Sequence, residues 1–279
     1  MEETRFTLLC DNNASALFGV LGEHGFSMLI ERGGEKVLFD TGQGFTLAHN
    51  AHVLGVDLRE ISHVVISHGH YDHTGGLEEV LHPSREISIH LHPHCFKPKY
   101  ASLSPEAQVF IGMKLSKEYI EGRRGRINTI TEFKEVVPGI YFSGEIEQEE
   151  EFSIKDPRLL AEIDGKIQPD PFKDDISLLV ETHSGPIVVL GCAHAGVVNI
   201  LRHFSRETGL KKFHGIIGGT HLGFFPPGDA LDNILKEMER FSLEFIAPCH
   251  CTGPVAAAHC HRRFGDRFEF VGAGWKRTF

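Results

Sequence analysis

Four side chains of types that bind metal ions fall within six residues of the sequence. They are His68, His70, Asp72 and His73, and they follow an apolar, β-branched stretch at residues 63–66. Where a chain leaves the end of a strand, residues i and i+2 can point the same way, so His68 and His70 can share one cation. Asp72 and His73 then face a second cation. The glycines that follow let the backbone pass close to the metals, and helical spacing of apolar residues begins after them. The segment therefore predicts a strand, a metal-binding loop and a helix.

The residues from His68 to His73 match the HxHxDH motif of the metallo-β-lactamase superfamily position by position. Further segments that resemble this superfamily follow the same order along the chain, namely FDTG at 39–42, GCAH at 191–194 and PCH at 248–250. The resemblance implies an α/β (α+β) fold of the αββα type, a four-layer sandwich in which two mixed sheets pack face to face. The helices would lie outside and the metals at one edge, in a single domain over residues 1–279.

The resemblance also implies two divalent cations and a set of ligands for each. The first set is His68, His70 and His194. The second set is Asp72, His73 and His250. Their nitrogens and carboxylate admit zinc, iron or manganese, and zinc is the metal expected here. The strand-end aspartate that usually bridges both metals has no clear match. The residues that could occupy related ground are Cys192, Asp174 and Asp175.

A second group of motifs makes the chain similar to the dihydropteroate-synthase-like branch of the superfamily, whose archaeal members include a dihydropterin-linked synthase. These motifs are EHGFS at 23–27, GCAHAG at 191–196, GGTHL at 218–222 and HCTG at 250–253.

Two cations about 4 Å apart can lower the pKa of a shared water and neutralise charge on an attacked or leaving oxygen. Two reactions fit. One is hydrolysis by a metal-bound hydroxide, and the other is transfer of a dihydropterin-methyl group to an aromatic amine with release of diphosphate.

A di-iron redox protein is the alternative class. Such relatives usually carry a glutamate at the position of His70, where this sequence has histidine. The substrate expected for either reaction is a small molecule, phosphorylated or pterin-like.

Further polar residues in these motifs are expected to serve the substrate or the ligands. Asp72 would orient the hydroxide, and His221 in GGTHL would contact the substrate or act as a general acid. Asp40 would hydrogen-bond a ligand imidazole from behind and fix its tautomer. Substrate contacts are expected from Glu23, His24, Cys192 and Thr252. Cys251 is interpreted as a neighbour of the site that is not a nucleophile.

Other histidines lie away from the HxHxDH motif and are predicted to be surface residues. They are His82, His90, His92, His94, His259 and His261. The segment at 95–170 departs from a simple superfamily core. We expect it to be an insertion that overhangs the site as a lid.

Composition fits one compact enzyme, because 41% of the 279 residues are hydrophobic and 24% are charged. No apolar run approaches the ~18 residues that a membrane span needs. The start of the chain does not resemble a signal peptide, and the six cysteines indicate reduced thiols, so a cytoplasmic location is expected. A net charge of −10 and a pI near 6.0 argue against nucleic acid and anionic membranes as partners. A homo-oligomer is left open.

Overall fold

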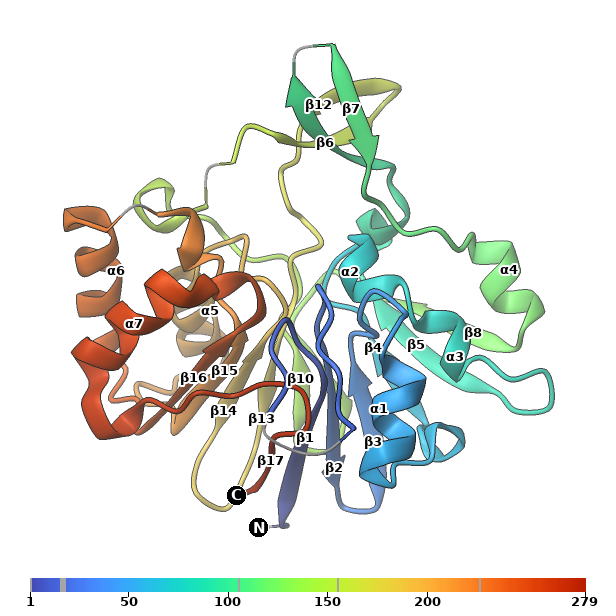
Figure 1. Ribbon diagram of the computed structural model, residues 1–279, viewed down its shortest axis with the longest axis horizontal. Coiled ribbons are helices and arrows are strands. Elements are labelled where there is room, and N and C mark those ends of the chain that lie inside the picture. The colour runs from blue at the N-terminus through green and yellow to red at the C-terminus, as the bar shows by residue number, and fades with distance from the viewer. Residues whose placement is uncertain (1, 16–18, 105, 155, 226) are drawn as a thin grey trace.

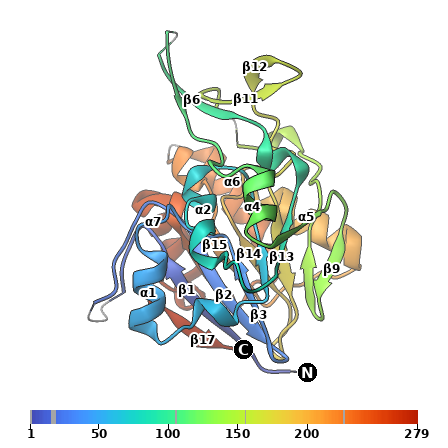
Figure 2. The ribbon, with the colours of Figure 1, turned by 90° about the vertical axis from the view of Figure 1, so that its right-hand side faces the viewer.

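The computed structural model describes residues 2–15, 19–104, 106–154, 156–225 and 227–279. Two large sheets pack against each other in the middle of the molecule, and a small third sheet projects beyond them (Figure 1). Helices cover the outer face of each large sheet (Figures 1 and 2). These layers confirm the αββα sandwich expected from the sequence.

The first sheet has seven strands. In spatial order they are β17 (Lys276–Thr278), β1 (Thr4–Cys10), β2 (Ser27–Arg32), β3 (Glu35–Phe39), β4 (His63–Val65), β5 (Ile87–Leu91) and β8 (Gly125–Thr129). The run from β3 to β8 is parallel, whereas β17, β1, β2 and β3 pair antiparallel.

The second sheet has six strands. In spatial order they are β16 (Phe245–Cys249), β15 (Gly215–Gly219), β14 (Ile187–Leu190), β13 (Ser177–Val180), β10 (Ile140–Phe142) and β9 (Lys134–Val137). Here β14, β15 and β16 are parallel and the other pairs are antiparallel. Each large sheet therefore contains a block of at least three parallel strands.

The helices lie outside the sheets or in the loops between strands. The α-helices are α1 (Leu47–Leu54), α2 (Tyr71–Thr74), α3 (Leu77–Val80), α4 (Lys117–Gly122), α5 (Val197–Thr208), α6 (Asp229–Glu239) and α7 (Gly253–Phe264). The short 3-10 helices are η1 (Leu58–Glu60), η2 (Pro93–Phe96), η3 (Glu150–Phe152), η4 (Leu222–Phe224), η5 (His250–Thr252) and η6 (Gly265–Arg267). None of the described helices is both long and apolar enough to cross a lipid bilayer.

Strand alternation explains why the sandwich needs four layers. Ile187 and Val189 of β14 pack into the core between the two sheets, whereas Val188 and Leu190 pack against the helices α5, α6 and α7. Because successive side chains of a strand point to opposite faces, a strand that is apolar at every position must be covered on both sides. The first sheet repeats this pattern, since Leu38 lies in a separate core with α1, α3 and α4.

The third sheet has four strands, β12 (Lys166–Pro169), β11 (Leu159–Ile163), β6 (Lys99–Ser104) and β7 (Ala107–Phe110). Residues 95–170 thus supply all of this sheet, but they also supply β8 of the first sheet and β9 and β10 of the second. The part of the segment that stands apart from the sandwich is formed by residues 99–110 and 159–169. Its role as a lid stays a prediction.

Candidate metal centre

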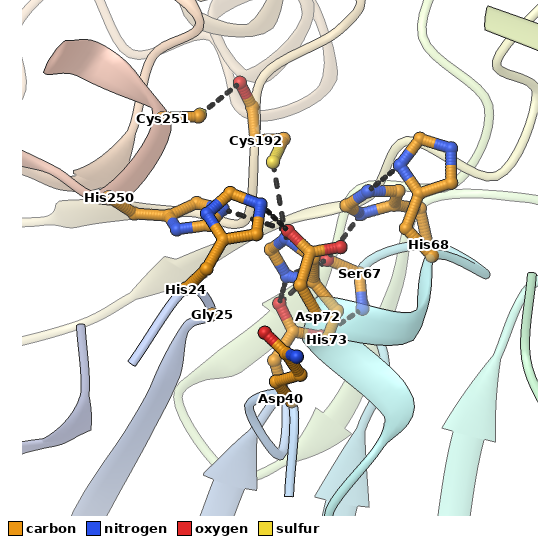
Figure 3. Close-up of polar contacts among 12 residues, drawn as sticks. His24, Gly25, Asp40, Ser67, His68, Asp72, His73, Cys192, His250 and Cys251 are labelled. Carbon is orange, nitrogen blue, oxygen red and sulfur yellow. Dashed lines mark hydrogen bonds and ion pairs between the residues drawn. The ribbon is translucent and has the colours of Figure 1, made fainter. Parts of the chain in front are cut away.

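The metal-binding types of side chain gather where the parallel strands of both sheets end. Asp40 follows β3, and the HxHxDH loop follows β4. On the second sheet, Cys192 and His194 follow β14, His221 follows β15 and His250 follows β16. Carboxyl ends of neighbouring parallel strands share one edge of a sheet, which is where open α/β sheets place their ligands. The two edges meet, and the side chains from both sheets face one another (Figure 3).

Four of these strand ends turn through a residue in left-handed backbone conformation. The φ angles are 59° at Asp40, 56° at Ala193, 53° at His221 and 49° at His250. A non-glycine residue in this region costs on the order of 1–3 kcal/mol, and such residues cluster at functional sites. Three of these residues are themselves candidate site residues, and the fourth, Ala193, directly precedes His194.

Close backbone packing fixes the HxHxDH loop. A methyl group added at Gly69 would lie 2.4 Å from the carbonyl oxygen of Cys95, and one at Gly75 would lie 2.1 Å from that of Gln43. The Gly69 N–H donates to Asp174 Oδ2 at 2.9 Å. Only glycine permits these approaches, so the glycines hold the ligands in place by letting neighbouring segments touch the loop.

The ligands predicted for the first cation come together. His68 Nε2 lies 2.9 Å from His70 Nδ1, and the rings of His68 and His194 have centroids 4.9 Å apart. The His194 ring stacks on Phe172 with centroids 4.0 Å apart. All three imidazoles are buried. His70 Nε2 and both ring nitrogens of His194 have no hydrogen-bond partner among the described residues.

The ligands predicted for the second cation also come together. Asp72 Oδ2 lies 3.6 Å from His73 Nε2 and 3.4 Å from His250 Nε2. The short helix α2 carries Asp72 and His73 in its single turn, as the sequence predicts for the segment after the loop. Figure 3 shows Asp72 between His73 and His250, with His24 beside them.

Cys192 lies between the two ligand sets. Its Sγ is 3.1 Å from His73 Nε2. The sulfur forms one group of potential ligands with His68 and His194, and another with His73 and His250, each with ligand atoms within 4.8 Å of one another. The sequence allows Cys192 either as a substrate contact or in place of the missing bridging aspartate, and the geometry favours the second reading.

The two aspartates considered for the bridging position lie elsewhere. Asp174 is bonded to the Lys99 ammonium at 2.9 Å and to the Gly69 amide, and Asp175 accepts the Ala195 N–H at 2.8 Å. Of the three candidates, Cys192 is the one whose ligand atom lies within 4.8 Å of potential ligands from both sets.

Burial and neighbouring charges set the protonation of the ligands. Burial lowers the pKa of His68 and His194 well below the usual range and, together with Lys99, lowers that of His70 to about 3. These rings are neutral and carry the lone pairs that a metal needs. Burial raises the pKa of Asp72, but the imidazoles of His73 and His250 outweigh this and hold it below its usual range.

Asp40 lies behind the ligands, at the position that the sequence predicts for it. Its Oδ2 accepts hydrogen bonds from His73 Nδ1 and Ser67 Oγ, both at 2.7 Å, and its Oδ1 accepts one from the Ser67 N–H at 2.7 Å. The carboxylate is fully buried. Burial opposes a charge on His73, yet the carboxylates of Asp40 and Asp72 raise its pKa to about 9. Because His73 Nδ1 donates its hydrogen bond to Asp40, the Nε2 atom is the one that faces the centre.

Two residues predicted to contact the substrate make structural hydrogen bonds, and their contact with substrate stays a prediction. The Glu23 carboxylate accepts the backbone N–H groups of Gln43, Phe45 and Thr46, so it holds the loop that leads into α1. Thr252 is buried and its Oγ1 bonds Thr220 Oγ1 at 2.9 Å, which joins the ends of β15 and β16. The sequence places both residues within the motifs but does not show which way their side chains point.

His24 and His221 both lie at the centre. His24 is half-exposed, and its Nε2 is 3.3 Å from Asp72 Oδ2. His221 is buried, its ring is 4.2 Å from that of His194, and neither of its nitrogens has a partner in the described part of the chain. His24 thus stands at the entrance, and His221 stands deeper on the second sheet.

Two histidines predicted to be surface residues are buried. His90 is 8% exposed and His92 is 1% exposed, and both lie at the carboxyl end of β5 or just beyond it. The prediction was wrong because β5 is covered on both faces, so alternation along the strand gives no exposed side. His90 contacts His63, with His63 Nδ1 3.0 Å from His90 Nε2.

Several residues around the centre gave no sequence signal. Asn12 Oδ1 is 2.8 Å from His250 Nδ1, and Asp11 Oδ1 accepts the His250 N–H at 2.7 Å. Lys99 of β6 is 1% exposed, and its ammonium binds Asp170 at 2.6 Å and Asp174. An isolated lysine or asparagine far along the chain has no spacing that links it to a site, so only the folded arrangement identifies these residues.

The donor set fits divalent metals. Buried, neutral imidazole nitrogens without hydrogen-bond partners are costly unless another group takes their lone pairs. Here several of them surround one thiol and one ionised carboxylate, a combination that suits zinc and related borderline-soft ions.

A family model for the metallo-β-lactamase superfamily matches residues 21–250, and the chain belongs to this superfamily. Within it, the chain is 32% identical over 262 residues to the 7,8-dihydropterin-6-methyl-4-(β-D-ribofuranosyl)-aminobenzene-5'-phosphate synthase of Methanocaldococcus jannaschii, covering 90% of this chain and 88% of the relative. An uncharacterised protein of the same archaeon is 31% identical over 252 residues, covering 88% of this chain and 90% of that protein. The crystal structure of a metal-dependent hydrolase of the β-lactamase superfamily is similar with a TM-score of 0.83, at 29% identity and 98% coverage of both chains.

Proposed function

We propose that this protein is a dinuclear metal-dependent enzyme that transfers a dihydropterin-methyl group from its diphosphate to an aromatic amine. The observation that carries the proposal is the 32% identity over nine-tenths of the chain to the archaeal synthase. The metals proposed are two zinc ions, held by His68, His70 and His194 on one side and by Asp72, His73 and His250 on the other, with Cys192 shared. When bound, the two cations would supply positive charge that neutralises the leaving diphosphate.

Residues at the entrance would bind and orient a planar substrate. Phe224 is 47% exposed and stacks on the His221 ring with centroids 4.2 Å apart and an angle of 7°. The Arg158 guanidinium lies over the Phe224 ring, 5.6 Å from its centroid, and it also pairs with Asp156 Oδ2 at 2.7 Å. An exposed aromatic side chain suits stacking with a flat heterocycle or an arylamine.

His221 is the group proposed to take up the proton that the amine loses on attack. Its ring is held by stacking on Phe224 and by contact with His194, while both nitrogens are free of hydrogen bonds within the described residues. Burial of the centre would also keep water away from the reacting carbon. The chain would therefore favour the amine over water as the acceptor.

The third sheet is proposed to enclose the bound substrate. Lys99 connects β6 of this sheet to Asp174, and Asp174 in turn bonds the Gly69 amide between two ligand histidines. Removing the exposed end of the β6–β7 hairpin should raise the KM for the substrate and leave metal content unchanged. Turnover and KM equal to those of the full chain would contradict the lid.

The experiment that tests the function measures diphosphate release from a dihydropterin-methyl diphosphate by zinc-loaded protein, with and without an arylamine acceptor. Release that depends on the amine and yields the coupled product supports the transferase. Hydrolysis of small esters or phosphoesters is the second candidate, favoured by the 29% identity to a metal-dependent hydrolase. Release that proceeds equally without amine, or no release at all, moves the assignment to that class.

A further inference from the structure

A third group of potential metal ligands lies next to the two proposed cations. Cys192 Sγ, a ring nitrogen of His221 and Cys251 Sγ all lie within 4.8 Å of one another. Two of the three atoms belong to residues that the dinuclear centre does not need as ligands. Figure 3 shows Cys251 and Cys192 side by side above His250.

Two of the three ligand atoms are not used by the proposed dinuclear centre, and the third, Cys192 Sγ, would be shared with it. His221 is only 5% exposed, and neither of its ring nitrogens has a hydrogen-bond partner in the described residues. Cys251 Sγ lies 3.6 Å from the Cys192 carbonyl oxygen, and all six cysteines are free thiols. A buried imidazole with two unused nitrogens beside a free thiol is an unsatisfied polar arrangement that a cation would satisfy.

The backbone is built to bring Cys251 to this position. A methyl group on Gly219 would lie 2.7 Å from Cys251 Sγ and 2.3 Å from the Gly191 carbonyl oxygen. Glycine at the end of β15 therefore leaves the room that the sulfur occupies. Cys251 is the middle residue of the η5 turn and is partly exposed.

The size and chemistry of the group fit a soft cation. Sulfur ligands lie about 2.3 Å from zinc, so atoms at two corners of a tetrahedron are about 3.8 Å apart. The ligand atoms lie within 4.8 Å of one another, so shifts of about 1 Å in side-chain position bring them to the distance that a tetrahedral ion needs. Two thiolates and one imidazole select zinc, cadmium or copper(I) over calcium, magnesium or manganese.

We propose that Cys192, His221 and Cys251 form a third, thiolate-rich cation site that takes a thiophilic ion beside the dinuclear centre. The sulfur of Cys192 carries lone pairs enough to be shared between this site and the first two. An ion here binds the His221 nitrogen, so it inhibits turnover; this consequence, though not the binding itself, rests on the proposed function.

The test titrates metal-free, fully reduced protein with Cd²⁺ and counts the bound ions by elemental analysis after dialysis. The wild-type chain should bind three equivalents. Cys251→Ala should bind two, with the affinity for the third ion reduced by more than ~10-fold. Cys260→Ala is the matched control, because Cys260 is a buried free thiol on α7 away from the group, and this variant should still bind three.

Cadmium-113 NMR of the wild-type protein gives a readout that needs no variant. We expect three resonances, and the one from the two-sulfur site should be shifted downfield and be lost selectively in Cys251→Ala. Two resonances and two equivalents in the wild-type protein, or three in Cys251→Ala, would overturn the third site. Retention of the first two equivalents separates that result from failure of the dinuclear centre, which would show as fewer than two ions in every protein.

Discussion

Replacement of Asp40 by asparagine tests how the fold tunes the metal ligands. The Asp40 carboxylate is fully buried and accepts three hydrogen bonds of 2.7 Å, two from Ser67 and one from His73 Nδ1. Asparagine has nearly the same shape but no charge and only one acceptor oxygen. Either Ser67 or His73 must then face an amide N–H, and the imidazole of His73 loses the carboxylate that fixes its orientation.

The expected magnitude follows from the kind of bond that is lost. A hydrogen bond to a charged group contributes about 1.5–3 kcal/mol, against about 0.5–1.5 kcal/mol for a neutral one. Loss of a partner behind a metal-bound histidine typically weakens metal affinity ~10–100-fold. We therefore expect Asp40→Asn to bind Zn²⁺ ~10–100-fold more weakly than the wild-type protein, which corresponds to about 1.4–2.7 kcal/mol.

The assay is competition for Zn²⁺ between the protein and a chromophoric chelator of known affinity. Asp57→Asn is the control, because Asp57 caps η1 by accepting the Arg59 N–H and asparagine caps equally well. This control should bind Zn²⁺ as the wild-type chain does. If Asp40→Asn also kept its affinity within about two-fold, the coupling from Asp40 through His73 to the metal would be refuted.

Three further variants probe the ligands, the pH dependence and the loop. Asp72→Ala should lose bound metal and activity while its far-ultraviolet circular dichroism stays that of the wild type, and full turnover would contradict its place among the ligands. Burial and His63 lower the pKa of His90 to about 4 from 6.5, so the unfolded chain alone takes up this proton as pH falls through that range. A contribution to the free energy of unfolding on the order of 2–3 kcal/mol is thus present above pH 6.5 and lost by about pH 4. In urea unfolding, His90→Phe should reduce this fall in stability at acid pH, and an unchanged fall would contradict the assignment to His90. Gly69→Ala forces a contact of 2.4 Å with the η2 backbone and should cost about 1–3 kcal/mol in thermal unfolding together with metal affinity, whereas Gly122→Ala meets no atom within 4 Å and should cost neither.

The parts of the site that the sequence predicts are those set by short spacing. His68, His70, Asp72 and His73 lie within one loop, so their order alone indicates that they share a centre. His250 could be placed because it follows an apolar strand in a recognisable turn. The sandwich was expected from the resemblance to the metallo-β-lactamase superfamily, and strands that are apolar at every position explain why both faces of each sheet are covered.

The remaining features depend on which way side chains turn after the strands end. Glu23 belongs to the EHGFS motif but bonds a backbone amide of a different loop. Cys192 lies within 4.8 Å of potential ligand atoms of His68, His194, His73 and His250, and the motif alone does not show this. His92 was predicted to be exposed and is buried under η2. Lys99 gave no signal, because a buried lysine is defined by partners seventy residues away.

The division of the ligands between the two sheets has a consequence for the stability of the whole molecule. His68, His70, Asp72 and His73 come from the first sheet, whereas Cys192, His194 and His250 come from the second. In the proposed centre neither sheet alone supplies a full set of ligands, so each bound ion would act as a cross-link between the halves of the sandwich. Binding linkage then adds about 4 kcal/mol to folding when free metal is 1,000 times its Kd. Chelation should therefore loosen the contact between the sheets before it melts either one, and amide exchange should speed up first at the strand ends that carry the ligands.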